Sequence, residues 1–471
     1  MSNHLGLDPD RVGSLDEHGH RKNIIPAEVR GKFRRARDWT QGILILFFLI
    51  LPWIKIGGHQ ALLLDIPRRE FAIFGLKLYA HDAPLIFFVL AILTIGLAFV
   101  TAVWGRVWCG WACPQTVFID GVFRRIEQFV EGGYLQRRKM ASTPITPQIF
   151  VKRSIKWFLF FVVSSAIAHS FAAYFVGADR ITEMMMGPPS ENWTYFVLVS
   201  SFTAAILFDF GWFREQFCII MCPYGRFQGL LMDSTSMAVL YDEKRGEPRK
   251  GMTAPGQTAG DCVSCRRCVE VCPTSIDIRK GLQMECIACT ACADACDEIM
   301  EKVKKPKGLI RYSNLRGGTW KLKKPRALLY GTLLFASVLG LGISLTGRSS
   351  LDVVILRGKE GLYQQVNDDK GNSVVVNHLR LHIRNQTSEG VSFLISAKTE
   401  DGKTLEVATA QNPVQMKPSE DQTLHIFVKF PPSVLDNKGE QRANLTFSSM
   451  AGGGFSIVKP LRLLGPSRNN E

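Results

Sequence analysis

Residues 262–296 read CVSCRRCVEVCPTSIDIRKGLQMECIACTACADAC, and the eight cysteines of this stretch follow one spacing twice. The first run is C-x2-C-x2-C-x3-C-P, from Cys262 to Pro273, and a second C-x2-C-x2-C-x3-C run extends from Cys286 to Cys296. Three thiolates at this spacing wrap one corner of a 4Fe–4S cluster within a tight turn, and the fourth ligand comes from a more distant point of the chain. The stretch therefore predicts two 4Fe–4S clusters.

The repeat has the spacing of bacterial ferredoxins with two clusters, in which the fourth cysteine of each run ligates the cluster of the other run. The expected ligand sets are Cys262, Cys265, Cys268 and Cys296 for one cluster, and Cys286, Cys289, Cys292 and Cys272 for the other. Zinc knuckles are the alternative, but they usually pair C-x2-C units without a third cysteine. Asp297 follows Cys296 where a proline is typical, but that proline is not a ligand. Because each set has four cysteines, no iron is left open for substrate chemistry, and the insert is expected to carry single electrons.

Long apolar segments elsewhere in the 471 residues predict a membrane protein with soluble parts. Five segments are expected to span the membrane as helices. Four of them are close to the roughly 20 residues that cross a bilayer, namely Pro84–Trp104, Trp157–Val176, Trp193–Phe213 and Ala327–Leu345. The first segment, Ile43–Ile56, is the weakest because Pro52 and Lys55 fall near its end. It starts far from the N-terminus and no small-residue cleavage site follows it, so it is not expected to be a signal peptide.

The net charge of +15 invites a nucleic-acid interpretation, but the basic residues gather in particular loops. The loop from 105 to 155 carries eight Lys/Arg against three acids, whereas the loop from 177 to 192 has Arg180 alone against three acids. Loops rich in Lys and Arg stay in the cytoplasm. We therefore expect a multi-pass protein of the bacterial inner membrane with its N-terminus and clusters in the cytoplasm. The tail after residue 347 is expected in the periplasm, and no nucleic-acid partner is expected.

Four of the twelve cysteines remain once the iron–sulfur set is assigned: Cys109, Cys113, Cys218 and Cys222. They form two C-x3-C-P motifs, WCGWACP at 108–114 and FCIIMCP at 217–223, which we interpret as an internal duplication. A spacing of four puts both sulfurs on one helix face, with the Cβ atoms about 5–6 Å apart, and the proline places each pair on a last helical turn. Buried cysteine is often just a small apolar side chain. The matched pairs nevertheless favour a function, which the residues leave open between bound copper, a thiol–disulfide relay and a third iron–sulfur site.

Other features are weaker signals. His169 and Asp209 lie inside predicted spans, where an ionisable group is by default a functional hypothesis, although a lone histidine serves equally well in a hydrogen bond between helices. Met184–Met186 lie in an outer loop and offer thioethers to Cu(I), but such residues are more often simply apolar. From about residue 349, short alternating runs separated by turn residues predict a β-sandwich of about seven strands.

The expected fold is a multi-domain membrane protein with five transmembrane α-helices, a cytoplasmic two-cluster insert (α+β) like a bacterial ferredoxin, and a C-terminal immunoglobulin-like β-sandwich. The expected boundaries are 1–38 for a cytoplasmic N-terminal segment, 39–213 for a four-helix membrane domain with the second C-x3-C-P motif at 218–223 just after it, 214–326 for the cytoplasmic domain with the insert at about 255–300, 327–346 for the fifth helix, and 349–471 for the periplasmic domain.

This combination resembles the FixG/CcoG/RdxA family, the iron–sulfur accessory proteins of cbb-type cytochrome c oxidase assembly. The stretches WCGWACPQTVFID (108–120) and CPTSIDIRKGLQMECIACTACADACDEIM (272–300) carry most of the resemblance. It covers nearly the whole chain and is least distinctive at the N-terminus and in the tail. It implies a membrane polyferredoxin that reduces Cu(II) to Cu(I) for delivery to the oxidase, with copper chemistry at Cys109, Cys113, Cys218 and Cys222.

The resemblance also implies partners. These are oxidase assembly factors or copper chaperones and transporters, with a cytoplasmic or quinol electron donor. The oligomeric state is open, with a homodimer among the options. Two other functions are compatible with the residues. One is a quinol-linked membrane ferredoxin that passes electrons to a partner reductase without binding copper, and the other is a non-redox assembly scaffold. Copper binding and Cu(II) reduction by the purified protein discriminate between them.

Overall fold

The computed structural model describes residues 24–56, 59–67, 70–79, 83–253, 258–314, 325–347, 349–358, 361–367, 373–387, 390–417, 420–450 and 455–467. The chain forms two compact units, Met1–Gly342 and Ile343–Glu471. Of the predicted N-terminal segment 1–38, the part before residue 24 lies outside the described residues.

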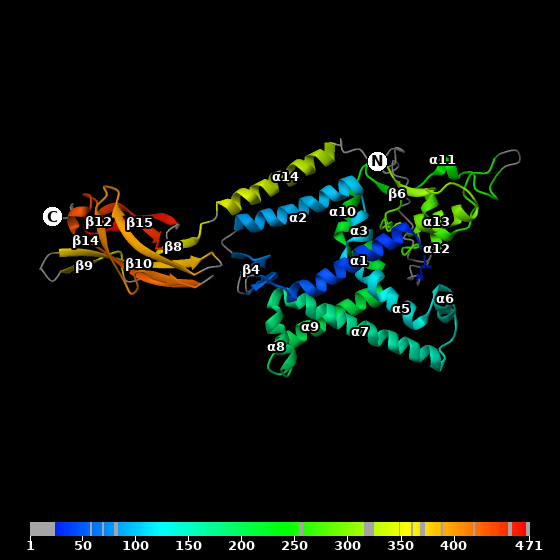
Figure 1. Ribbon diagram of the computed structural model, residues 1–471, viewed down its shortest axis with the longest axis horizontal. Coiled ribbons are helices and arrows are strands. Elements are labelled where there is room, and N and C mark those ends of the chain that lie inside the picture. Colours follow the sequence, from blue (N-terminus) through cyan, green and yellow to red (C-terminus); the bar gives the residue numbers. More distant parts are fainter. Residues whose placement is uncertain are drawn as a thin grey trace. The chain divides into compact units, whose positions relative to one another are not determined.

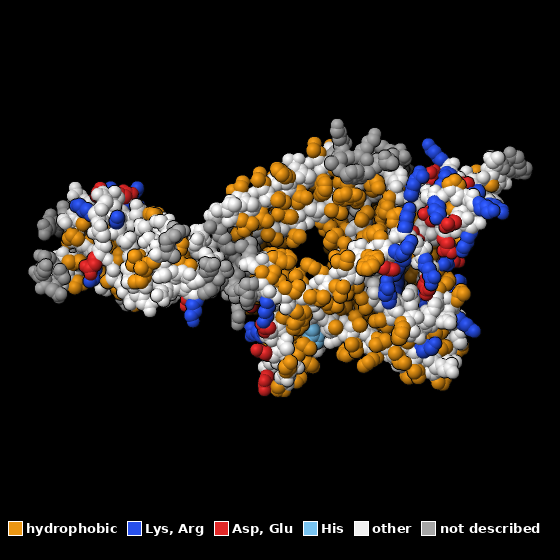
Figure 2. All heavy atoms as spheres, in the orientation of Figure 1, with side chains coloured by type: hydrophobic (Ala, Val, Ile, Leu, Met, Phe, Trp, Pro, Cys, Tyr) orange, Lys and Arg blue, Asp and Glu red, His pale blue; other side chains and the backbone are white. Residues whose placement is uncertain are grey.

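Four described helices are long and apolar enough to cross a membrane, and they match the last four predicted spans. They are α2 (Ala83–Trp104), α7 (Pro147–Val176), α9 (Trp193–Ile206) with the π-helical turn η3 (Leu207–Phe213) that continues it, and α14 (Pro325–Thr346). α2 and α14 lie side by side in Figure 1, and a Cβ at Gly340 would stand 2.5 Å from the ring of Phe88. Hydrophobic side chains cover the outer faces of these helices in Figure 2, as expected for helices that face lipid.

The predicted first span is folded differently from the other four. Helix α1 extends over Lys32–Ile50, a 3-10 turn η1 over Leu51–Trp53 contains Pro52, and Lys55–Ile56 form strand β1. Proline lacks a backbone N–H and does not continue a helix. The apolar half of α1, residues 43–50, is only about 12 Å long at 1.5 Å per residue, against roughly 30 Å of hydrocarbon in a bilayer. The expectation of a continuous apolar helix over Ile43–Ile56 is therefore wrong, and the number of five spans stays a prediction.

The C-terminal end of α1 lies beside the C-terminal end of α7. The hydroxyl of Tyr174 donates a hydrogen bond to the carbonyl oxygen of Phe48 at 2.7 Å. The strands after α1 pack in the same region, since Gln60 donates to the carbonyl oxygen of Ala173 at 2.9 Å. These strands are the pair β1 and β2 (His59–Gln60), and the antiparallel sheet of β3 (Leu62–Asp65), β4 (Glu70–Ile73) and β5 (Leu76–Tyr79). Helix α1 thus extends from this region to the cysteine-rich insert, as Figure 1 shows.

Short helices connect the long ones and carry the C-x3-C-P motifs. They are α3 (Val107–Trp111), α4 (Pro114–Phe118), the π-helical turn η2 (Ile119–Phe123), α5 (Arg124–Glu131), α6 (Tyr134–Ser142), α8 (Ala178–Met186), the π-helical turn η4 (Phe217–Met221) and α10 (Pro223–Leu231). The insert pairs β6 (Ala238–Tyr241) with β7 (Ile310–Ser313) and adds α11 (Glu243–Gly246), α12 (Arg267–Glu270), the 3-10 turn η5 (Ile278–Lys280) and α13 (Ala291–Lys302). This mixture of short helices and strands is the predicted α+β type.

The second unit is a β-sandwich, as predicted, with nine described strands: β8 (Leu351–Arg357), β9 (Gln364–Asn367), β10 (Ser373–Asn385), β11 (Val391–Thr399), β12 (Thr404–Thr409), β13 (Val414–Met416), β14 (Asp421–Phe430), β15 (Glu440–Ser449) and β16 (Ser456–Leu464). Strand β12 pairs with β14 of one layer and with β11 of the other. Alternate residues of β10 and β11 are buried in a single core, for example Leu381 and Ile395. The two strands beyond the predicted seven, β9 and β13, are too short for sequence alternation to show them.

Candidate metal centres

The two cysteine runs of the insert repeat the same backbone conformation. Ser264 and Ala288 each follow the first cysteine of a run by two residues, and their φ angles are 59° and 53°. Arg266 and Thr290 each follow the second cysteine directly, with φ angles of 57° and 60°. Residues with a side chain rarely adopt positive φ. Its recurrence at equivalent positions shows that both loops curl in the same way, as expected of two turns that each wrap a cluster.

Two enclosed pockets lie inside these loops. The first is lined by Cys262, Cys265, Cys268 and Cys296. The second is lined by Cys272, Cys286, Cys289 and Cys292, with Cys268 also on its wall. The structure thus brings together the members of each predicted ligand set, including the fourth cysteine that comes from the other run.

The chemistry of both pockets fits a 4Fe–4S cluster, which takes four thiolate ligands in a setting shielded from water. Burial raises the pKa of the Cys268 thiol to about 11 and the pKa values of Cys286 and Cys296 to about 12, because apolar surroundings disfavour the thiolate. The positive charge of bound iron offsets this cost. No three His, Cys, Asp or Glu side chains of the described residues are grouped to hold a single metal ion.

The two C-x3-C-P motifs share one local structure. The first cysteine lies in a short helical turn, Cys109 in α3 and Cys218 in η4. The second cysteine is the N-cap of the next helix, with extended φ and ψ of −64° and 127° at Cys113 and −68° and 112° at Cys222. The following proline disfavours a helical conformation at each of them and suits the first helical position. The backbone thus repeats as the duplication predicts, but the second cysteine has left the helix. The expectation that both sulfurs of a pair lie on one helical turn is therefore wrong.

The thiols of the two motifs gather in one place. Burial raises the pKa of the Cys109 thiol to about 11, and the proximity of Cys113 and Cys222 adds to the rise. Burial also raises the pKa of Cys218, with further contributions from Cys113, Cys109 and Cys222. The side-chain amide of Gln228, in α10, donates a hydrogen bond to the sulfur of Cys109 at 3.0 Å. The second motif's helix therefore supports the first motif's cysteine, and four soft donors lie near one another.

The first motif lies directly against the loop of the second pocket. A Cβ at Gly110 would stand 2.6 Å from the carbonyl oxygen of Ile287, so the two backbones approach this closely only because Gly110 has no side chain. Two arginines form hydrogen bonds to backbone carbonyl oxygens of the same loop. Arg106 donates to the carbonyl oxygen of Cys286 at 3.3 Å, and Arg37 donates to the carbonyl oxygen of Cys289 at 2.7 Å.

A chain of hydrogen bonds joins the same two segments. The indole N–H of Trp111 donates to the hydroxyl of Tyr312 at 3.1 Å, and that hydroxyl donates to the carbonyl oxygen of Ala288 at 2.9 Å. Cys109 also packs against the apolar cluster that contains Cys289. The Cys109 thiol and the predicted cluster ligand Cys289 therefore pack in the same apolar cluster.

Asp294, in α13, fastens the insert to α1. Its carboxylate accepts hydrogen bonds from the backbone N–H groups of Phe33 at 3.2 Å and Arg34 at 2.6 Å. These N–H groups belong to the first turn of α1, which has no partner for them within the helix. A Cβ at Gly31 would collide with the Asp294 carboxylate. A buried acid from the insert thus caps a helix that comes far earlier in the chain.

We expect Asp294→Ala to lower the free energy of unfolding by about 1–2 kcal/mol, the usual cost of a lost N-cap. The change removes both acceptors from the first turn of α1 and leaves the cluster cysteines untouched. Thermal unfolding in detergent measures the loss. Asp294→Asn keeps one of the two acceptor oxygens and is expected to lose less than Asp294→Ala. No loss of stability in Asp294→Ala would contradict the capping role.

The sequence pattern did not point to Gln115, which joins the two motifs. Gln115, directly after the proline of the first motif, donates to Asp209 at 2.9 Å and to the carbonyl oxygen of Arg214 at 3.2 Å. Asp209 therefore has a partner that ties the end of η3 to the first motif. The ring nitrogen Nδ1 of His169 hydrogen-bonds the carbonyl oxygen of Ser165 in its own helix at 2.7 Å. Met184–Met186 end helix α8, where the side chains of Met185 and Met186 are exposed.

Three family models match the chain. A 4Fe-4S dicluster domain matches residues 213–315, and a 4Fe-4S binding domain matches residues 85–132, which contain Cys109 and Cys113. The model described as an IG-like fold at the C-terminal of FixG matches residues 341–466. Iron–sulfur domains and an immunoglobulin-like tail are thus recognised where the cysteine runs and the β-sandwich lie.

Curated relatives match most of the chain. Protein RdxB of Cereibacter sphaeroides is 33% identical over 405 residues, which is 81% of this chain and 83% of that protein. Protein RdxA of the same organism is 33% identical over 396 residues, or 80% and 82% of the two chains. The nitrogen fixation protein FixG of Rhizobium meliloti is 34% identical over 328 residues, or 66% of this chain and 61% of that protein. The crystal structure of a FixG-related protein from Vibrio parahaemolyticus is 17% identical with a TM-score of 0.20, and it covers 25% of this chain and 97% of that one.

Proposed function

The chain belongs to the FixG/RdxA family of membrane iron–sulfur proteins, and from this premise we propose that it transfers electrons through two 4Fe–4S clusters to Cu(II) at the paired cysteines. The Cu(I) formed serves the assembly of a cbb-type cytochrome c oxidase. The contact between Gly110 and the loop at Ile287 is the observation that carries the proposal, because it sets a C-x3-C-P motif against the predicted ligands of a cluster.

The ligands of the first cluster are Cys262, Cys265, Cys268 and Cys296, and those of the second are Cys286, Cys289, Cys292 and Cys272. The two pockets support this assignment, because each is lined by all four cysteines of one set. The shared wall at Cys268 supports rapid exchange of electrons between the two sites. The second site faces the membrane motifs, since its loop packs against Gly110 and accepts a hydrogen bond from Arg106, and Tyr312 links the loop to Trp111.

Copper is the substrate of the paired cysteines Cys109, Cys113, Cys218 and Cys222. Thiolates are soft donors that favour Cu(I) over Cu(II), so binding at these residues assists reduction. Each Cu(II) gains one electron from a reduced cluster, which is re-reduced by a quinol or by a cytoplasmic electron carrier.

The protein lies in the bacterial inner membrane with the insert in the cytoplasm and the β-sandwich in the periplasm. The distribution of Lys and Arg among the loops supports this orientation. This orientation requires one further membrane passage before α2, and this fifth span is part of the proposal. Oxidase assembly factors and copper chaperones are the partners that this role requires.

The test is reduction of Cu(II) by the full-length protein under anaerobic conditions, followed with a Cu(I)-specific chelator after the clusters have been reduced and excess reductant removed. We expect the double variant Cys109→Ala/Cys218→Ala to lose this activity, because both motifs lose the thiolate that lies inside the helical turn. Its iron content and cluster EPR spectrum are expected to equal those of the wild type. Met221→Leu is the control, since it changes another sulfur side chain in the second motif and leaves all four cysteines in place.

Each of the other outcomes supports a different function. Unchanged Cu(II) reduction in the double variant contradicts the copper role, and oxidation of quinol without any copper binding indicates the quinol-linked ferredoxin. A wild type that reduces neither acceptor points to the assembly scaffold. The match of residues 85–132 to a 4Fe-4S binding domain favours a third cluster at the four thiols as the second candidate. In that case the double variant loses about four iron atoms per chain.

A further inference from the structure

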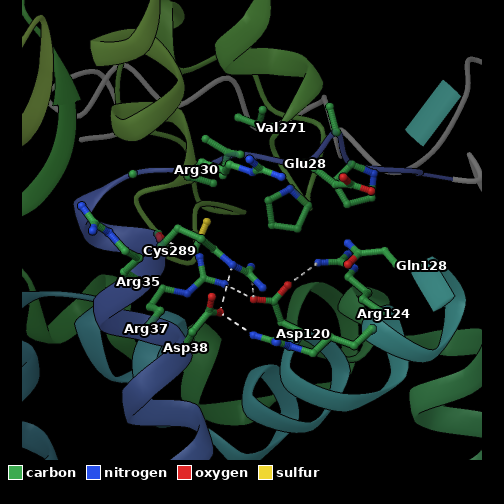
Figure 3. A pocket seen from close by; sticks show the side chains of 18 of the residues that line it. Glu28, Arg30, Arg35, Arg37, Asp38, Asp120, Arg124, Gln128, Val271 and Cys289 are labelled. Atoms are coloured by element: carbon green, nitrogen blue, oxygen red, sulfur yellow. Dashed lines mark hydrogen bonds and ion pairs between the residues drawn. The ribbon is translucent and has the colours of Figure 1, made fainter. Parts of the chain in front are cut away.

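A large pocket lies where α1, α5 and the cysteine-rich insert meet. Its volume is about 700 Å³, and Figure 3 shows Arg35, Arg37 and Asp38 of α1 on one side, Arg124 and Gln128 of α5 on the other, and Asp120 between them. Val271 and Cys289 of the insert close the wall opposite the membrane helices. The pocket therefore touches the predicted second cluster site without being part of it.

The pocket carries more positive than negative charge. Its lining includes seven arginines, namely Arg30, Arg34, Arg35, Arg37, Arg124, Arg125 and Arg137, against the carboxylates of Glu28, Asp38 and Asp120. The single carboxylate of Asp120 pairs with Arg34, Arg37 and Arg124. Glu215 and Glu127, outside the lining, pair with Arg124 and Arg137. A surplus of two positive charges remains even when these outer acids are included.

The surplus is found both at the rim and in the wall of the pocket. Arg30 and Arg35 are exposed at the rim, and neither forms an ion pair with a described carboxylate. In the wall, the Nε atoms of Arg37 and Arg124 are buried and have no hydrogen-bond partner among the described residues. Guanidinium groups recognise phosphate through paired hydrogen bonds. A site with this composition is complementary to a phosphate-bearing anion.

A second groove continues the pocket along α1. The two share Arg35, Asp38 and Arg125, and the groove then extends past Trp39, Gly42, Ile45 and Gly121. A Cβ at Gly42 would meet no atom within 4 Å, so this part of the helix surface is open. The side chain of Trp39 is 76% exposed, and tryptophan in such a position marks a membrane–water interface. The groove thus leads from the arginines towards the apolar half of α1.

We propose that this pocket and groove bind an anionic phospholipid, with its phosphate among the arginines and an acyl chain along Trp39, Gly42 and Ile45. Basic pockets at the ends of membrane helices suit such headgroups. The lipid reaches across α1, α5 and the loop of Cys289, whose carbonyl oxygen already accepts a hydrogen bond from Arg37. It holds the insert against the membrane helices by neutralising the surplus charge where these parts meet.

The test compares lipids added to delipidated full-length protein in detergent, with thermal unfolding as the readout. We expect phosphatidylglycerol or cardiolipin to raise the unfolding temperature in a saturable way, and phosphatidylcholine to have no such effect, because a ligand that binds the folded state stabilises it. The rim variant Arg30→Gln/Arg35→Gln is expected to weaken the apparent affinity for phosphatidylglycerol by at least about tenfold. The control Arg138→Gln/Lys139→Gln removes two exposed charges from α6, outside the pocket, and is expected to bind as the wild type does.

Gly42→Leu separates lipid from a soluble phosphate compound. Leucine fits the open space at this position and fills the groove, so we expect it to weaken phospholipid binding and to leave any effect of inorganic phosphate unchanged. The lipid assignment would be overturned if inorganic phosphate or flavin mononucleotide stabilised the protein as much as phosphatidylglycerol does and Gly42→Leu had no effect. Equal losses in the rim variant and in the α6 control would overturn the site itself.

Discussion

Replacing one cluster ligand is expected to remove about four of the roughly eight iron atoms per chain that two 4Fe–4S clusters hold, and pairs of replacements then report which cysteines share a cluster. Cys272→Ala/Cys289→Ala is expected to lose no more iron than either single variant, because both residues line the same pocket. Cys272→Ala/Cys265→Ala is expected to lose nearly all the iron, because Cys265 lines the other pocket. Iron analysis of the anaerobically purified protein, with EPR of its reduced form, measures both.

The alternative is that each run of four cysteines ligates its own cluster. In that case Cys272 shares a cluster with Cys265, and the two double variants exchange their results. Met284→Leu, near the cysteines in sequence but outside both sets, is the control for a general effect of substitution in the insert and is expected to keep all its iron. A loss of all iron in every single variant would show that one cluster does not form without the other.

Gly110→Ala is expected to slow the reduction of Cu(II) sharply while both clusters are still assembled. The new Cβ would stand 2.6 Å from the carbonyl oxygen of Ile287 and 2.9 Å from the carbonyl carbon of Ala288. These are backbone atoms, so the loop of the second cluster site must move away from the first C-x3-C-P motif. Strain of this kind typically costs about 1–3 kcal/mol of stability. Anaerobic Cu(II) reduction and thermal unfolding measure the two effects, and iron content shows that the clusters remain.

Gly342→Ala is the matched control for this substitution. It adds the same methyl group in helix α14, where a Cβ meets no atom within 4 Å, and it is expected to leave Cu(II) reduction unchanged. If Gly110→Ala reduces Cu(II) as fast as the wild type, the contact between the motif and the loop has no part in electron transfer. The proposed route from cluster to thiol would then be wrong even if the clusters and the copper role are correct.

The membrane helices show what apolar composition alone predicts and what it does not. Four apolar segments form helices as predicted. In a helix of about 20 apolar residues, the backbone groups hydrogen-bond to one another and the side chains are compatible with lipid. The segment at Ile43–Ile56 does not form such a helix, because Pro52 ends the helix and because the start of α1 lies outside the apolar run. The charged residues from Lys32 to Asp38 belong to α1. Asp120 pairs with two of its arginines, and Asp294 caps its first turn. Those partners are remote in sequence, so periodicity in the segment does not reveal them.

The spacing of the cysteines predicted which of them belong together in the insert, because three ligands of each set lie within one short loop, and both loops curl locally at Ser264, Arg266, Ala288 and Thr290. It also determined that two C-x3-C-P motifs repeat, because proline sets the local backbone after Cys113 and Cys222. The position of the first motif against the second cluster loop follows from packing between distant parts of the chain. That contact depends on a glycine and on carbonyl oxygens held by Arg37 and Arg106. Backbone carbonyls are the same at every position, so their role appears only when distant parts of the chain have packed together.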